Sequence, residues 1–150
     1  MQTAYIWTVS VLIVAISTSC SFRIDGGQIE REKAAAVDAI DALHRQINDQ
    51  AFDAIYRNAS ASLRSSQSRR DVFSYLDQIR SRFGFFKAVS HVDLNVIAIV
   101  PTQVRAVYNS HYEKGDTTEL FVFVRDENQM RLAQYTIFPG FIRPAEELAR

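Results

Sequence analysis

The chain has 150 residues, of which 47% are hydrophobic and 23% are charged, and its 17 Lys and Arg residues balance its 17 Asp and Glu residues. This length suits one domain that buries its own core, so neither a disulfide nor a metal is needed to hold it together. The balanced charge argues against nucleic-acid binding, which rests on a basic excess that neutralises phosphates.

The first predicted element is an apolar leader. No charged side chain precedes Arg23, and the run from Ala4 to Ile16 is almost wholly apolar. This run has the length of a signal-peptide core. It ends in Ser17-Thr18-Ser19, directly before Cys20, the only cysteine of the chain. An apolar run, small residues and a cysteine resemble a bacterial lipoprotein signal, in which the cysteine is lipidated and becomes the first residue.

Three interpretations of the leader stay open: a lipoprotein signal over residues 1–19, a retained membrane helix, and a signal cleaved without lipidation. A helix over residues 1–22 would rise about 33 Å, which suffices for a hydrocarbon core of about 30 Å. Residues 20–28 contain Gly26-Gly27 and are predicted to form a linker. All three interpretations place the rest of the chain in the bacterial cell envelope, membrane-anchored and facing the periplasm or the exterior.

Helical periodicity dominates the next part of the chain. Apolar residues recur every three or four positions over residues 29–50 and predict a long helix. A short helix is expected near residues 52–57, and residues 58–68, rich in Ser and Ala, are expected to form a loop. Ser68 predicts the N-cap of a further helix, and Gly84 predicts its end. The apolar positions of the first helix are Val37, Ile40, Leu43 and Ile47.

After Gly84 the apolar period changes to two, which is typical of strands. Glu119 and Arg131 flank the last turn and are expected to pair across adjacent strands. The four predicted strands cover residues 92–100, 102–112, 119–125 and 130–138.

Helices followed by strands predict an α+β domain over residues 29–142, with a C-terminal tail at 143–150. In this domain the N-terminal helices pack on a curved antiparallel sheet of about four strands.

This order resembles the nuclear transport factor 2-like superfamily, a cone-shaped fold. Several local features are similar to one exported bacterial branch, domain of unknown function 4019, over roughly residues 33–138. The resemblance implies the fold and the compartment but no reaction. The segments that carry it are 52–56, the Ser-containing loop 60–68, Arg80 to Gly84, Val107 to Tyr112, Glu119, and Met130-Arg131-Leu132-Ala133-Gln134-Tyr135.

Polar residues at strand spacing are the candidates for a site. Alternation alone places such residues on the solvent side of a half-exposed sheet, and no spacing pairs a base with an orienting group. We therefore predict no catalytic residue, no metal and no cofactor. The aromatic positions Phe121, Phe123, Tyr135 and Phe138 are expected in the core, with pocket lining as the alternative. The possible pocket residues are His91, Asp93, His111, Glu119 and Tyr135.

Two classes of function remain. The first is an envelope lipoprotein whose domain binds a protein partner or a small apolar ligand. The second is a small hydrolase or isomerase with an acid–base residue in the cone. We favour the first, and we expect a homodimer through the sheet face because nuclear transport factor 2-like proteins often pair in this way.

Overall fold

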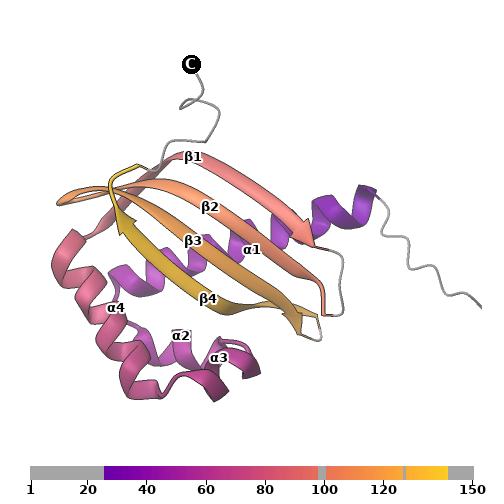
Figure 1. Cartoon of the computed structure of the whole chain (residues 1–150), viewed down its shortest axis with the longest axis horizontal. Coiled ribbons are helices and arrows are strands. Elements are labelled where there is room, and N and C mark those ends of the chain that lie inside the picture. The colour runs from indigo at the N-terminus through magenta and orange to yellow at the C-terminus, as the bar shows by residue number, and fades with distance from the viewer. Residues whose placement is uncertain (1–25, 98–100, 127, 142–150) are drawn as a thin grey trace, which may run out of the picture.

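The computed structural model describes residues 26–97, 101–126 and 128–141 (Figure 1). Within them, helices precede an antiparallel sheet, as the sequence predicted for an α+β domain. The leader with Cys20 and the tail lie outside the described residues. The elements are α1 (Gly26–Asn48), α2 (Phe52–Asn58), α3 (Ala61–Ser66), α4 (Arg69–Phe83), β1 (Phe86–Ile97), β2 (Gln103–Tyr112), β3 (Gly115–Asp126) and β4 (Gln129–Pro139).

The long helix α1 forms because its apolar residues fall on one stripe. Ile40, Leu43 and Ile47 are buried, while Asp41 and Arg45 on the opposite face are exposed. The helix runs across one face of the sheet, and this contact buries the stripe (Figure 1). None of the described helices combines the length and the apolar character that crossing a bilayer requires.

The expected loop at 58–68 contains a helix, α3, and this part of the prediction was wrong. The Ser60 hydroxyl accepts a hydrogen bond from the Leu63 amide at 3.2 Å and so caps α3. The Ser60 amide donates to the Leu132 carbonyl in β4, at 2.9 Å. Only Leu63 of α3 is buried, so the apolar periodicity of the segment is too weak to reveal a helix.

Both predicted boundaries of α4 are confirmed. The Ser68 hydroxyl accepts from the Asp71 amide at 3.2 Å and donates to the Asp71 carboxylate at 2.7 Å. Gly84 follows the last residue of the helix with a φ of 78°, in the region that favours glycine.

The sheet has the order β1-β2-β3-β4, and every neighbouring pair is antiparallel. β1, β3 and β4 are longer than predicted, whereas β2 nearly matches its predicted bounds. β1 begins at Phe86, and β3 already begins at Gly115, so the turn between β2 and β3 consists of Glu113 and Lys114 alone. Bulges interrupt the register in β1 between Val89 and His91, and next to Val122 and Phe123 in the β3–β4 pair.

The predicted pair of Glu119 and Arg131 does not form. Glu119 lies opposite Ile137, whereas Arg131 lies opposite Val124, close to the β3–β4 turn. Arg131 instead contacts the Asp126 carboxylate at 3.1 Å. The prediction failed because antiparallel partners lie at equal distances from their turn, whereas Glu119 lies seven residues before Asp126 and Arg131 only two after Gln129.

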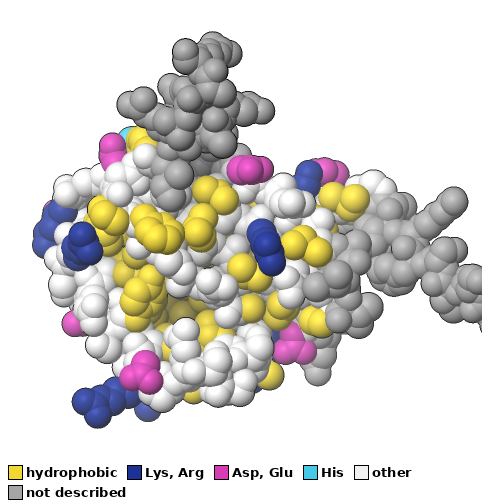
Figure 2. Space-filling view, viewed as in Figure 1, with side chains coloured by type: hydrophobic (Ala, Val, Ile, Leu, Met, Phe, Trp, Pro, Cys, Tyr) yellow, Lys and Arg dark blue, Asp and Glu magenta, His cyan; other side chains and the backbone are white. Residues whose placement is uncertain are grey.

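The two faces of the sheet differ. One face packs against the helices, and no described helix covers the other (Figure 1). In β2 the side chains alternate between the two, so that Arg105 points to the open face while Val104 and Ala106 are buried. Figure 2 shows apolar side chains spread across the open face.

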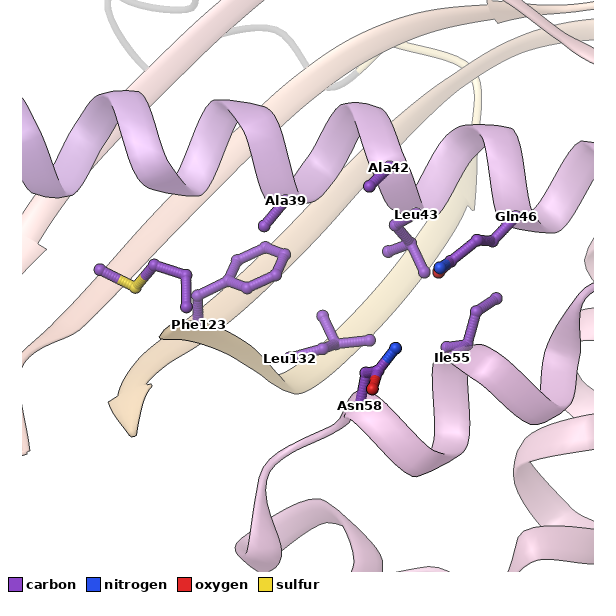
Figure 3. Close-up of a pocket in the computed structure, with 9 residues that line it drawn as sticks. Ala39, Ala42, Leu43, Gln46, Ile55, Asn58, Phe123 and Leu132 are labelled. Atoms are coloured by element: carbon purple, nitrogen blue, oxygen red, sulfur yellow. The ribbon is translucent and has the colours of Figure 1, made fainter. Parts of the chain in front are cut away.

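A small pocket lies on the helix side of the sheet, between α1, α2 and the strands β3 and β4 (Figure 3). Its volume is about 150 Å³. Leu43 of α1, Ile55 of α2 and Phe123 of β3 form buried parts of its wall.

Candidate functional site

A single carboxylate, that of Glu119, lies in the middle of the packed interface between the helices and the sheet. Alternation along β3 turns Glu119 to the same side as Phe121, and its side chain is 0% exposed. A charged group in such a place is costly unless it is paired and hydrogen-bonded. The surrounding residues therefore decide whether Glu119 can carry its charge.

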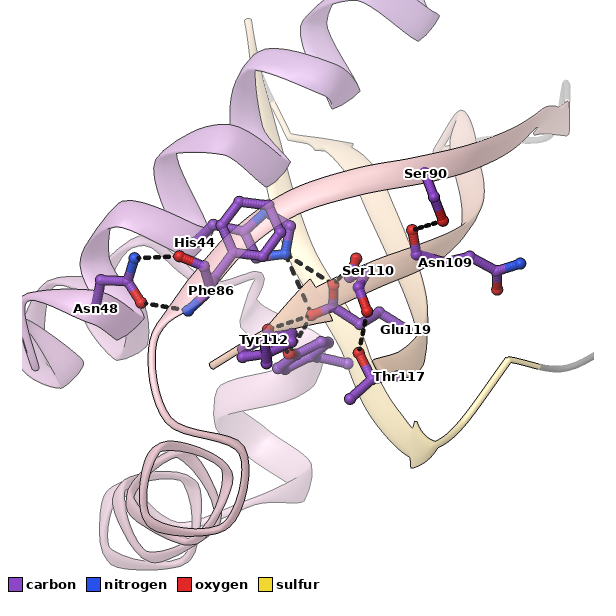
Figure 4. Close-up of polar contacts among 10 residues, drawn as sticks. His44, Asn48, Phe86, Ser90, Asn109, Ser110, Tyr112, Thr117 and Glu119 are labelled. Carbon is purple, nitrogen blue, oxygen red and sulfur yellow. Dashed lines mark hydrogen bonds and ion pairs between the residues drawn. The ribbon is translucent and has the colours of Figure 1, made fainter. Parts of the chain in front are cut away.

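Four side chains donate hydrogen bonds to the Glu119 carboxylate (Figure 4). His44 Nε2 of α1 lies 2.9 Å from Oε2, and Ser110 Oγ of β2 lies 2.5 Å from the same oxygen. The hydroxyls of Tyr112 in β2 and Tyr135 in β4 lie 2.7 and 2.6 Å from Oε1. We call Glu119 and these four donors the Glu119 cluster. It joins α1 to three strands.

Strand register explains the sheet side of the cluster. Tyr108 lies opposite Glu119, so Ser110 and Tyr112, two and four residues further along β2, share its face. In β4, Tyr135 lies opposite Phe121 and stacks on it with ring centroids 5.0 Å apart. Because side chains alternate along these neighbouring strands, Ser110, Tyr112 and Tyr135 all point to the face that carries Glu119.

Aromatic packing fixes the His44 ring. The ring stacks on Phe86, with centroids 3.7 Å apart and planes 7° apart, and meets the Phe121 ring edge-on at 5.8 Å. Asn48, one turn later in α1, holds the Phe86 backbone through its side-chain amide, which accepts from the Phe86 amide at 2.9 Å and donates to its carbonyl at 3.2 Å. These two hydrogen bonds hold Phe86 in place, and the His44 ring that stacks on it therefore points its Nε2 at Glu119.

The cluster stabilises the ionised form of Glu119. Burial alone would raise the pKa of the carboxyl, but the hydrogen bond and charge of His44, with the bonds from Ser110 and Tyr135, outweigh burial and lower the pKa. Burial and the Glu119 charge raise the pKa values of Tyr112 and Tyr135 well above their ordinary range. Both phenols thus stay protonated and act as donors.

The cluster leaves very little room for a substrate. A void reaches Tyr135 from the side of α2, α3 and α4, but it has a volume of about 20 Å³, which holds about one water molecule. Each carboxylate oxygen of Glu119 already accepts hydrogen bonds from two donors. An acid–base group needs a free position within hydrogen-bond reach of its substrate, so this arrangement suits holding elements together better than proton transfer.

Of the five possible pocket residues, the structure brings two into contact, Glu119 and Tyr135, which share a hydrogen bond. Asp93 is exposed on the open face of the sheet. His111 is half exposed, with its Nδ1 2.7 Å from the Asp116 carboxylate. The side chain of His91 lies outside the described part of the chain.

One aromatic expectation was wrong. Phe121 and Phe123 are in the core, but Phe138 is 39% exposed. The bulge in the β3–β4 pair shifts the alternation of β4 by one position, so that Tyr135 and Ile137 face the helices and Phe138 does not.

Sequence reasoning missed His44, Ser110 and Tyr112. A signal for His44 was present, because it lies on the apolar stripe of α1, four residues after Ile40 and three before Ile47. A polar residue on a buried stripe needs a partner. Nothing in the sequence indicates that this partner is 75 residues away.

Among the described residues, no group of three or more His, Cys, Asp or Glu side chains is placed to hold a metal ion. No protein-family model matches the chain, and no curated protein is significantly similar to it.

Proposed function

We propose that this chain is a non-catalytic binding module of the bacterial envelope, held at a membrane by its N-terminus. Its domain would bind a protein partner through the open face of the sheet, and the simplest such partner is a second copy of the chain. The observation that carries this proposal is the apolar character of a sheet face that no described helix covers (Figures 1 and 2).

The centre of this face is a shallow groove of about 310 Å³ across β2, β3 and β4. Val107, Leu120 and Val122 line it, with Arg105 and Gln134 at its edges. Apolar side chains gathered on an open surface and rimmed by polar ones are typical of protein-binding sites. Partner binding would remove these side chains from water.

The open face also carries two opposite charges, which a second copy of the chain can complement. Asp93 of β1 lies opposite Val107, and Arg105 of β2 lies opposite Asn95, so both charges are on the open face. Neither forms an ion pair within the described residues. In a two-fold interface through the groove, a contact between Asp93 of one copy and Arg105 of the other would form twice, because such an interface pairs each patch with itself.

The dimer is tested by sedimentation of residues 21–150. Leu120→Glu should shift the chain to a monomer, whereas Ala34→Glu, on the exposed face of α1, should not. Asp93→Arg and Arg105→Asp should each weaken the dimer, and combining them should restore it. A wild-type chain that stays monomeric at high concentration would remove the homodimer.

We further propose that the fold is a nuclear transport factor 2-like cone. The helix-then-sheet order and the bulges in the β1–β2 and β3–β4 pairs support a curved sheet. Three of the segments that carry the resemblance to domain of unknown function 4019 also contribute to one cluster, through Tyr112, Glu119 and Tyr135. An experimental structure that superposes poorly on such folds would contradict this assignment.

The membrane anchor is proposed to be a lipidated Cys20. Acyl chains contribute about 0.8 kcal/mol per buried CH₂, and more than one chain makes anchoring stable. Mass spectrometry of the mature N-terminus should show a modified Cys20 as the first residue. An unmodified Cys20 still preceded by residues 1–19 would favour a retained helix.

The alternative is a small hydrolase or isomerase, and the His44–Glu119 pair is the observation that favours it. The pair has the composition of an acid–base dyad, but its burial and its saturated oxygens argue for a structural role. Tyr135→Phe removes one donor and keeps the ring. A folded Tyr135→Phe variant that lost all function in the cell would favour the enzyme.

A further inference from the structure

The pocket between α1 and α2 has the lining of a small-molecule site. Its buried wall consists of Leu43, Ile55, Phe123 and Leu132, none more than 8% exposed. They come from α1, α2, β3 and β4, so the pocket depends on the packed fold and not on one loop (Figure 3). Most small-molecule sites are preformed hollows with apolar walls of this kind.

Two amide groups lie on the same side of this pocket. Gln46 comes from α1 and Asn58 from the last residue of α2 (Figure 3). Within the described part of the chain, neither side-chain amide forms a hydrogen bond, although each offers both a donor and an acceptor. A few convergent polar groups beside an apolar wall are what orients a ligand in a pocket.

Small and adaptable residues leave the space. Ala39 and Ala42 face the pocket from α1, where longer side chains would fill it. Met130 closes another side, and its unbranched side chain adapts to the shape of what it contacts. No charged residue lines the pocket.

We propose that this pocket binds a small neutral molecule with one ring, or a branched chain of similar size, that carries a single amide group. The size follows from the volume, since a cavity of roughly 150 Å³ with aliphatic and aromatic walls accepts benzene. The amide follows from Gln46 and Asn58, which offer donors and acceptors to a group that has both. A charged ligand is disfavoured because no charged side chain lines the pocket to pair with it.

Benzamide is the probe, and acetamide, which lacks the ring, is its control. The full chain, kept in solution with detergent and labelled at its methyl groups, is titrated by NMR. Benzamide should shift the methyl signals of Leu43, Ile55, Leu132 and Met130 in the millimolar range, and acetamide should not. Gln46→Met should weaken benzamide binding about three- to tenfold, as expected for one lost hydrogen bond.

Ala42→Leu fills the pocket and should abolish the shifts, whereas Ala34→Leu, on the exposed face of the same helix, should leave them unchanged. Circular-dichroism melting confirms that each variant is folded. No shift in the wild-type chain, or a shift that survives Ala42→Leu, would overturn the proposal. The site lies on the opposite side of the sheet from the proposed partner face, so Leu120→Glu should keep benzamide binding and separate the two proposals.

Discussion

Replacing Glu119 by glutamine should destabilise the domain severely. The amide keeps one acceptor oxygen but adds two donors to a site that already holds donors from four side chains. It also removes the negative charge that faces His44, whose side chain is 2% exposed. Breaking a buried pair from one side costs about 3–5 kcal/mol, out of the 5–15 kcal/mol that roughly bounds the stability of a domain.

Urea unfolding with linear extrapolation measures this cost. Glu30→Gln is the matched control, because Glu30 is exposed and forms only a surface pair with Lys33, and it should change the free energy of unfolding by less than about 0.5 kcal/mol. His44→Phe should cost about as much as Glu119→Gln, because the phenyl ring can stack on Phe86 but leaves the buried carboxylate without its partner.

The double variant separates a pair from two independent sites. Once either partner is gone, losing the other removes little more, so the double variant should lose less stability than the sum by up to about 3 kcal/mol. A cost below about 1 kcal/mol for Glu119→Gln, or strict additivity with His44→Phe, would refute the claim that the Glu119 cluster holds α1 on the sheet.

Three further predictions concern stability. Gly84→Val should lower the melting temperature clearly, because a Cβ at this positive φ would lie 2.8 Å from Glu113 Oε2 and 2.9 Å from its Cβ; an unchanged melting curve would contradict this. Because the pKa of Glu119 is lowered by folding, its contribution is complete above the ordinary carboxyl pKa of about 4.3 and is lost as pH falls through the lower folded value. Urea midpoints between pH 7 and 3 should therefore fall more steeply for the wild type than for Glu119→Gln, and equal slopes would exclude this carboxyl as a cause. Ser60→Ala should cost about 1 kcal/mol by removing the cap on the Leu63 amide, and thermal unfolding that matches the wild type would show that α3 does not need it.

The parts of the fold that the sequence predicted are those that local physics determines. Ser68 and Gly84 bound α4 because capping and a positive φ act within one turn of the chain. Period-two alternation located all four strands. The strand ends were missed where they depend on neighbours, as at Gly115, which joins the ladder through Tyr112 in β2.

The candidate site was only half predictable. Alternation singled out Glu119 and Tyr135, but it also suggested Asp93 and His111, which point elsewhere. A period of two separates the faces of a strand without saying which face is buried. His44 could have been flagged as a polar residue on an apolar stripe, but only the packing of α1 on β3 reveals its partner.

The position of His44 and Glu119 in the chain has a consequence for the order of events during synthesis. The four described helices leave the ribosome before the strands on which they pack, and 75 residues separate the two halves of the buried pair. At roughly 5–20 residues per second, about 4–15 s pass before Glu119 follows His44. During that time the apolar stripe of α1 has no sheet to pack on, so its full burial has to wait for the strands.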